Sequence, residues 1–219
     1  VGVGGQSIRS VKNVIAKDLP ANAKVREDMV VDLMEANRAM EYPDQEKQSY
    51  VIQEYKVDSQ YQIDPVGIQC SHLEGNFLNI LQRYTFYKNL NRCLENAGIN
   101  VADMFISPIA LADSILTETE KRSGCALVDI GADTTTVCVY NKNILRHLAV
   151  IPLGSRNITK DIASLQIEES EAEKMKLKYA SAYTDNADID NDLNLPIDQE
   201  RSVDSRKFIE IVEGRLEEI

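Results

Sequence analysis

The stretch CALVDIGADTTTVCVY, residues 125–140, contains the most informative local pattern of the chain. An apolar run from Cys125 to Val128 ends in Asp129, and a glycine, three consecutive threonines and a second apolar segment follow. An apolar run without polar alternation is typical of a strand that is buried on both faces of a sheet. An unpaired aspartate buried there would cost free energy of order 2–7 kcal/mol. We therefore expect Asp129 to have hydrogen-bond donors or a cation as partners.

The residues that follow Asp129 can supply such partners. Gly131 permits a tight turn, Ala132 permits close approach, and Thr134 to Thr136 offer hydroxyl and backbone N–H groups. Backbone N–H groups in a tight turn bind anions, and a nearby carboxylate can hold a magnesium ion through water. The pattern predicts a loop for the terminal phosphates of a nucleotide. D-x-G-x-x-T is a short pattern, and it also fits an ordinary hairpin in which Asp129 hydrogen-bonds its own turn.

Two later motifs favour the nucleotide interpretation. In IPLGSRNITKDI, residues 151–162, Gly154 leads into a helix N-terminus, which is a second kind of anion site. Glu173 and Lys176 lie three residues apart on one face of a further helix, where they could hydrogen-bond a ribose and flank an adenine. The alternative for this second motif is structural, because Ser170-x-x-Glu173 is also a capping box.

Upstream of these motifs, the periodic segments occur in the order strand, helix, strand, strand. The sequence predicts a strand at 8–15 followed by a break at Asp18-Leu19-Pro20, a helix at 26–40, a strand-rich segment at 50–63 and a strand at 73–81. The helix carries apolar side chains at helical spacing, which indicates a face packed in a core: Met29, Val30, Leu33, Met34 and Met40.

The remaining elements are shorter. We expect a helix at 85–97, a strand at 101–106, a helix at 108–116, and then a charged, exposed segment at 117–124. Three strands should follow at 125–130, 136–140 and 144–151, with Asn141-Lys142-Asn143 as a hairpin turn. Helices are expected at 157–166, 170–182 and 205–219, and a mobile loop at 183–203.

Composition excludes several classes of function. The formal net charge of -11 argues against binding to nucleic acid. None of the four cysteines pairs with another at metal-ligand spacing, which fits a reducing cytoplasm. No stretch approaches the roughly 18 apolar residues of a membrane span. Because residues 1–3 read as a strand that ends at Gly4-Gly5, we expect an earlier part of the protein outside this sequence.

The order of the motifs resembles a known superfamily. A strand, a D-x-G-x-x-T hairpin, a third strand, a glycine, a helix and an E-x-x-K helix resemble the second half of actin-like ATPases. More narrowly, IPLGSRNITKDIA (151–163) and AEKMKLKYASAY (172–183) resemble FtsA, the actin-like family of bacterial cell-division proteins. The segments VGVGGQSIRSVKN (1–13), QEYKVD (53–58), DPVGIQCSHLEGNFLNI (64–80) and NRCLENAGI (91–99) resemble the part of FtsA that holds its inserted subdomain.

This resemblance implies the fold class and the domains. The expected fold is α/β, a fragment of the actin-like ATPase (ribonuclease H-like) fold with an α+β insert, the strand–helix–strand–strand SHS2 subdomain. The expected domains are the inserted subdomain at 1–86, of which 1–5 end a strand of the first ATPase half, a return segment of that half at 87–120, and a truncated second half at 121–219.

The resemblance also implies site residues and cofactors. ATP and Mg²⁺ are the expected cofactors, with the metal held by Asp129 through water. The nucleotide-binding residues would be the loop residues Asp129, Gly131, Asp133, Thr134 and Thr135, the terminal-phosphate glycine Gly154, and the nucleoside contacts Glu173 and Lys176. FtsA proteins commonly have glycines where Ala132-Asp133 stands here. An acid beside a triphosphate weakens binding unless a cation offsets it, so we expect at most a weak ATPase.

The family's function is implied in the same way. The protein would form filaments with itself, tether FtsZ to the inner face of the cytoplasmic membrane at the division site, and recruit later division proteins through the SHS2 subdomain. A first phosphate loop is expected before Val1, and further adenosine contacts and a C-terminal membrane helix after Ile219. The chain alone should therefore bind ATP weakly, stay apo and be inactive. The alternatives are another actin-like ATPase, such as a pilus-assembly adaptor or a DnaK-type chaperone, and a non-catalytic interaction module that has lost nucleotide binding.

Overall fold

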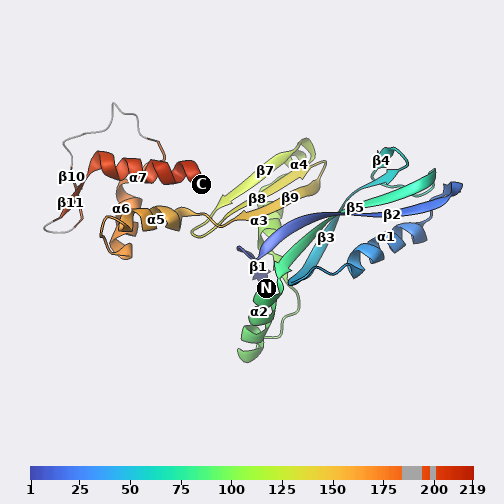
Figure 1. Cartoon of the computed structure of the whole chain (residues 1–219), viewed down its shortest axis with the longest axis horizontal. Coiled ribbons are helices and arrows are strands. Elements are labelled where there is room, and N and C mark those ends of the chain that lie inside the picture. Colours follow the sequence, from blue (N-terminus) through green and yellow to red (C-terminus); the bar gives the residue numbers. More distant parts are fainter. Residues whose placement is uncertain (184–193, 198–200) are drawn as a thin grey trace. The chain divides into compact units, whose positions relative to one another are not determined.

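The structure is a computed structural model that describes residues 1–183, 194–197 and 201–219 (Figure 1). The chain divides into two compact units. The first unit comprises Val1–Asp129 and Thr136–Val150, and the second comprises Ile130–Thr135 and Ile151–Ile219. This division does not test the boundary that the sequence suggests at 120/121, which stays a prediction.

The first unit contains a four-stranded antiparallel sheet with a helix packed on one face (Figure 1). In spatial order its strands are β2 (Ile8–Lys24), β5 (Gln69–Arg83), β3 (Gln45–Val57) and β4 (Gln60–Gln62). The helix α1 (Glu27–Ala39) buries Leu33 in a cluster with Leu73 and Phe77. The predicted order of strand, helix, strand, strand is confirmed.

The apolar stripe of α1 largely faces this core. Met29, Val30 and Met34 are partly buried against it, as the helical spacing predicts. Met40 is the exception, because the helix ends at Ala39 and Met40 is 37% exposed.

The strand β2 is longer than expected, and the prediction that it ends before a break at Asp18-Leu19-Pro20 is wrong. It continues through Pro20 to Lys24, but its pairing with β5 shifts in register between Asp18 and Ala23. Proline lacks the N–H that a sheet ladder needs, and it is tolerated at bulges for that reason. The sequence signal was therefore correct about a local irregularity and wrong about the end of the strand.

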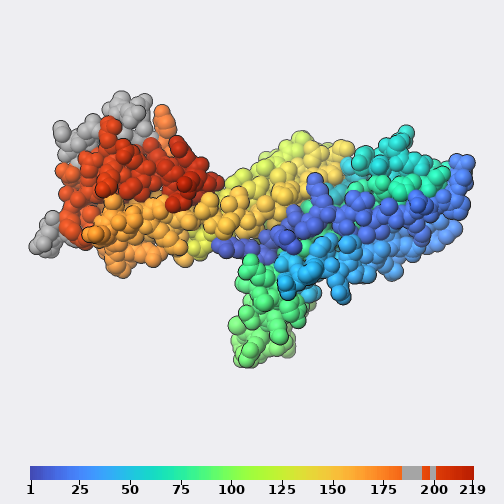
Figure 2. Space-filling model, viewed as in Figure 1, coloured from blue at the N-terminus to red at the C-terminus, as the bar shows by residue number. Residues whose placement is uncertain are grey.

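Short elements complete the middle of the first unit. The strands β1 (Gly2–Val3) and β6 (Phe105–Ile106) pair in parallel. The helices are α2 (Tyr84–Asn96), α3 (Ser107–Ile115) and α4 (Glu118–Ser123). No residue of α2 is buried, and Figure 2 shows this helix projecting from the rest of the unit. The segment expected to be only charged and exposed forms α4, which Thr117 and Glu120 close with a capping box.

A three-stranded sheet follows, in the order β7 (Cys125–Ile130), β8 (Thr135–Asn141) and β9 (Ile144–Ile151). The predicted hairpin turn is confirmed, since Lys142 and Asn143 have positive φ angles of 54° and 62°. Residues of β8 and β9, such as Cys138 and Leu148, share a buried cluster with Ile8 and Leu78 of the four-stranded sheet.

The second unit is built around α5 (Ser155–Ala163), α6 (Glu169–Tyr179) and α7 (Ser205–Glu218). Its core includes Ile162, Met175 and Phe208, one from each helix. The strands β10 (Asn194–Pro196) and β11 (Ser202–Asp204) form an antiparallel pair. The expectation of a mobile loop at 183–203 is wrong for these two strands, and elsewhere it falls partly on 184–193 and 198–200, outside the described residues.

Within the described part of the chain, no helix combines the length and the apolar character that crossing a membrane requires.

Candidate nucleotide-binding site

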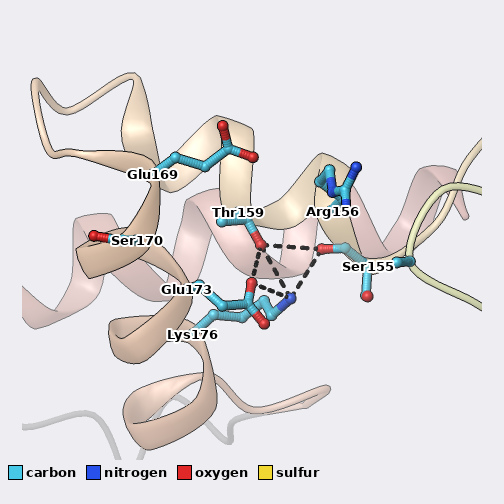
Figure 3. A pocket seen from close by; sticks show the side chains of 8 residues that line it. Ser155, Arg156, Thr159, Glu169, Ser170, Glu173 and Lys176 are labelled. Carbon is cyan, nitrogen blue, oxygen red and sulfur yellow. Dashed lines mark hydrogen bonds and ion pairs between the residues drawn. The ribbon is translucent and has the colours of Figure 1, made fainter.

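A pocket of about 480 Å³ lies in the second unit. It is formed by the 131–135 loop and the facing sides of α5 and α6 (Figure 3). The residues that line it are Ala132, Ser155, Arg156, Thr159, Glu169, Ser170, Glu173 and Lys176. Two predicted nucleoside contacts, Glu173 and Lys176, are therefore brought together with a residue of the predicted phosphate loop.

Backbone hydrogen bonds fasten the predicted phosphate loop to the start of α5. The Ser155 amide donates to the Gly131 carbonyl at 2.9 Å, and the Arg156 amide donates to the Ala132 carbonyl at 2.8 Å. A Cβ atom on Gly154 would lie 2.6 Å from both carbonyl oxygens, so the close approach needs glycine at this position. The sequence predicted Gly154 as a site residue, and the structure shows what the missing side chain permits.

The helix N-terminus is already engaged by the chain itself. The Gly154 amide donates to Asn157 Oδ1 at 3.1 Å, while the amides of the next two residues bond the loop carbonyls. In this conformation these N–H groups do not face a ligand. An anion at the start of α5 would have to replace these internal hydrogen bonds, and the predicted phosphate contact at Gly154 stays a prediction.

Glu173, Lys176 and Thr159 form a hydrogen-bonded cluster at one side of the pocket (Figure 3). Lys176 Nζ lies 2.7 Å from Glu173 Oε2, and it donates to Thr159 Oγ1 at 3.0 Å and to the Ser155 carbonyl at 3.2 Å. The Thr159 hydroxyl donates to Glu173 Oε2 at 2.5 Å. The contacts of Glu173 and Lys176 with Thr159 and the Ser155 carbonyl thus hold α6 against α5.

The same contacts lower the pKa of Glu173. The hydrogen bond from Lys176 is the main cause and the one from Thr159 comes second, because both favour the charged carboxylate. A carboxyl group whose pKa is lowered by folding stabilises the folded state at pH values above its pKa in the unfolded chain. This stabilisation is lost as the pH falls through its pKa in the folded protein. The cluster is therefore fully formed at neutral pH.

The alternative interpretation of Glu173 as part of a capping box is wrong. The N-cap of α6 is Glu168, two residues before Ser170, and its side chain makes no cap hydrogen bond. The Ser170 hydroxyl instead donates to Glu168 Oε2 at 2.6 Å. Glu173 is left to face the pocket and Lys176.

The loop residues have distinct positions. The Gly131 amide donates to the Thr134 carbonyl at 2.8 Å, which closes the predicted tight turn. The Thr135 side chain is buried, and its hydroxyl donates to the Leu153 carbonyl at 2.9 Å, so it holds the loop in place. Asp133 pairs with Arg156 at 3.1 Å. Its carboxylate therefore has a cationic neighbour that the sequence did not reveal.

Asp129 is exposed at the end of β7, which lies at the edge of the three-stranded sheet within the described residues. The expectation that it is buried in a central strand is wrong. Among the described residues, no group of three or more histidines, cysteines, aspartates and glutamates could hold a metal ion. A magnesium ion bound through water to nucleotide phosphates needs only one or two carboxylates, a role that Asp129 can fill. Its role as a magnesium residue stays a prediction.

Sequence reasoning missed five residues that line the pocket: Ser155, Arg156, Thr159, Glu169 and Ser170. A signal existed for two of them, since Ser155 and Thr159 are four residues apart and share a helix face. Arg156 and Glu169 gave none, because charged side chains at helix starts are common on any solvated surface.

Two family models, which describe different parts of the same kind of protein, match this chain. The model of the SHS2 domain inserted in FtsA matches residues 5–81, and the model of cell division protein FtsA matches residues 126–212.

Relatives named cell division protein FtsA align with most of the chain. The Bacillus subtilis protein is 34% identical over 100% of this chain and 51% of its own length. The Porphyromonas gingivalis protein is 34% identical over 85% of this chain and 39% of its own length, and the Escherichia coli K12 protein is 28% identical over 96% and 51%. The chain thus spans about half the length of the curated relatives it matches, or somewhat less.

Two solved structures are similar in part. One is a PilM-PilN type IV pilus biogenesis complex, with 19% identity, a TM-score of 0.47 and coverage of 78% of this chain and 48% of that chain. The other is MreB5 of Spiroplasma citri bound to ADP, with 14% identity, a TM-score of 0.47 and coverage of 60% and 44%.

The two family models confirm the predicted fold class, an actin-like fold with an SHS2 insert. They match different parts of the chain, and together with the relatives they account for most of its length. The chain therefore belongs to the FtsA family of cell division proteins.

Proposed function

We propose that the whole protein acts in bacterial cell division as an actin-like, ATP-binding filament protein. It tethers FtsZ to the inner face of the cytoplasmic membrane at the division site and recruits later division proteins through the SHS2 subdomain. The support is membership of a family whose relatives are named cell division proteins. In this role the whole protein is at most a weak ATPase.

Within that role, this chain supplies one side of a nucleotide site. The observation that carries the proposal is the pocket that places Glu173 and Lys176 beside Ala132 of the phosphate loop, inside one compact unit. The carboxylate of Glu173 accepts from the ribose hydroxyls, and Lys176 contacts the nucleoside while it stays anchored to α5. We also assign the water-mediated magnesium contact of the whole protein to Asp129.

The test is to titrate magnesium-ATP into the whole protein and into its Lys176→Met variant by calorimetry. A hydrogen bond to a charged group is worth about 1.5–3 kcal/mol, so we expect the dissociation constant to rise roughly 10- to 100-fold. Lys174→Met is the matched control. It removes the same charge from the same helix, where Lys174 pairs with Glu171 and does not line the pocket.

A competing function also has an observation in its favour. Glu173, Lys176 and Thr159 already satisfy one another, as expected of a structural network in an interaction module without a ligand. If magnesium-ATP binds the whole protein with the same affinity in both lysine variants, or does not bind at all, the nucleotide proposal is wrong and the interaction module stands.

A further inference from the structure

The Asp133–Arg156 ion pair lies at the rim of the pocket. Arg156 Nη1 is 3.1 Å from Asp133 Oδ1, and the two side chains are 50% and 57% exposed. Arg156 lines the pocket, whereas Asp133 is not among the lining residues. The pair therefore joins a pocket cation to an acid outside the pocket.

The backbone places these two residues together. The Arg156 amide donates to the carbonyl of Ala132, the residue directly before Asp133. A neighbouring hydrogen bond joins the Ser155 amide to the Gly131 carbonyl, and Gly154 allows the loop and the start of α5 to approach closely. The position of the Asp133 carboxylate next to the guanidinium is thus a consequence of how the loop is fastened to α5.

Arg156 differs from the other cation in the pocket lining. Lys176 is bound to Glu173, to Thr159 and to the Ser155 carbonyl, and its side chain is 12% exposed. In Figure 3 the guanidinium of Arg156 lies apart from that hydrogen-bonded cluster. Since the amides at the start of α5 bond the chain itself, Arg156 is the cation of the pocket lining that an anion can reach with the least rearrangement.

We propose that Arg156 is the polyphosphate contact of this pocket and that Asp133 is its competing counter-ion. In the free protein the Asp133 carboxylate pairs with the Arg156 guanidinium. When a polyphosphate binds, its oxygens replace the carboxylate as partners of the guanidinium. This inference rests on the proposed nucleotide-binding function and adds a regulation to it: the chain lowers its own affinity for polyphosphate through Asp133.

The relative strengths of the two contacts favour this exchange. The Asp133 pair has one contact at 3.1 Å and is half exposed, and pairs of this kind contribute little to stability. A phosphate group offers a guanidinium two parallel hydrogen bonds and more negative charge, which makes a stronger contact. Asp133 is therefore weak enough to be displaced, while it still competes with an arriving anion for the guanidinium.

The experiment is a double-mutant cycle in the whole protein with Asp133→Asn, Arg156→Gln and the double variant. The probes are magnesium-ATP and, without a nucleoside, inorganic tripolyphosphate, each titrated by calorimetry at one fixed ionic strength. We expect Asp133→Asn to tighten tripolyphosphate binding by about three- to tenfold, and Arg156→Gln to weaken it about tenfold or more. In the Arg156→Gln background, Asp133→Asn should change affinity less than about twofold.

Lys160→Gln is the matched control for lost positive charge. Lys160 is exposed one turn further along α5 and does not line the pocket, so its variant should bind both probes as the wild type does. Circular dichroism spectra of all variants check that the second unit stays folded.

Several outcomes would overturn the inference. If Asp133→Asn tightens binding equally with and without Arg156, Asp133 repels the anion directly and does not compete with it for Arg156. If it weakens binding only when magnesium is present, Asp133 is a metal residue. If Lys176→Met weakens magnesium-ATP binding while the Asp133 and Arg156 variants match the wild type, the ion-pair inference fails and the nucleotide site stands. If neither the wild type nor Asp133→Asn binds either probe, both proposals fail.

Discussion

Gly154 shows how a single residue determines the site. Its neighbours on α5 bond the carbonyls of Gly131 and Ala132, and those carbonyl oxygens lie where a side chain at position 154 would have to stand. The obstacle is backbone, which cannot rotate away as a flexible side chain could. The requirement for glycine here comes from close approach, since its φ of -163° is open to any residue.

We predict that Gly154→Ala destabilises the second unit by about 1–3 kcal/mol, the usual cost of overpacking. Gly214→Ala is the control, because Gly214 lies in α7 with nothing within 4 Å of an added Cβ. There alanine should stabilise by roughly 0.5–1 kcal/mol through helix propensity. Urea unfolding followed by circular dichroism at 222 nm measures both, and equal stabilities for Gly154→Ala and the wild type would contradict the argument.

At the residue level, the sequence could predict the positions whose chemistry has a local signature. Gly154 before a helix and the Glu173–Lys176 pair at helical spacing are signals of this kind. The partner of Asp133 could not be predicted, because Arg156 is 23 positions away and only the loop-to-helix hydrogen bonds bring them together. The exposure of Asp129 was misjudged because its apolar run indicates burial regardless of where the strand lies in the sheet.

At the scale of elements, α1 is stabilised by the face it buries against the four-stranded sheet. Leu33 is 2% exposed and packs with Phe77 and Leu73, whereas Val31 on the same helix is 48% exposed. Transfer from water and the cavity left behind both contribute to the cost of truncating a buried leucine. The contrast between these two positions makes the helix its own control.

We predict that Leu33→Ala lowers the free energy of unfolding of the first unit by about 2–5 kcal/mol. Val31→Ala should change it by no more than about 0.5 kcal/mol, because an exposed side chain loses little. Urea unfolding of the two variants side by side measures the difference. A Leu33→Ala variant as stable as Val31→Ala would mean that the helix does not pack on the sheet.

Periodicity predicted α1 and the β8–β9 hairpin because their signals are local. It could not predict what lies under the end of α1, where Asn37 and Asn79 are fully buried and exchange two side-chain hydrogen bonds, at 2.9 and 3.0 Å. An asparagine in a helix reads as solvated unless its partner, 42 positions away, is known. The β10–β11 pair was missed for a similar reason, since three-residue strands carry too short a pattern.

At the scale of the whole molecule, the family segments and the compact units do not coincide. Residues 136–150 match the FtsA model, yet they belong to the first unit, because Leu145 and Leu148 share a buried cluster with Ile8 and Leu78. Sequence similarity reflects common ancestry, whereas the extent of a compact unit is set by which apolar faces pack together. The boundary drawn from sequence at 120/121 therefore answers a different question from the division into units.

Each buried cluster of the described residues draws its members from one unit. The clusters around Leu33 and around Leu78 lie in the first unit, and the cluster around Phe208 lies in the second. Residues that share a core lose their protection together when it opens, whereas residues in separate cores can open independently. The two units should therefore respond separately to mutations.

We predict that Phe208→Ala, which truncates a fully buried side chain, speeds amide hydrogen exchange in α5 and α6 and leaves β5 protected. Leu33→Ala should do the reverse, and the double variant should show the sum of both effects. Hydrogen exchange followed by mass spectrometry resolves the two regions in one sample. If either single variant speeds exchange in both units to the same degree, the chain unfolds as one cooperative body and the separation of its cores has no energetic meaning.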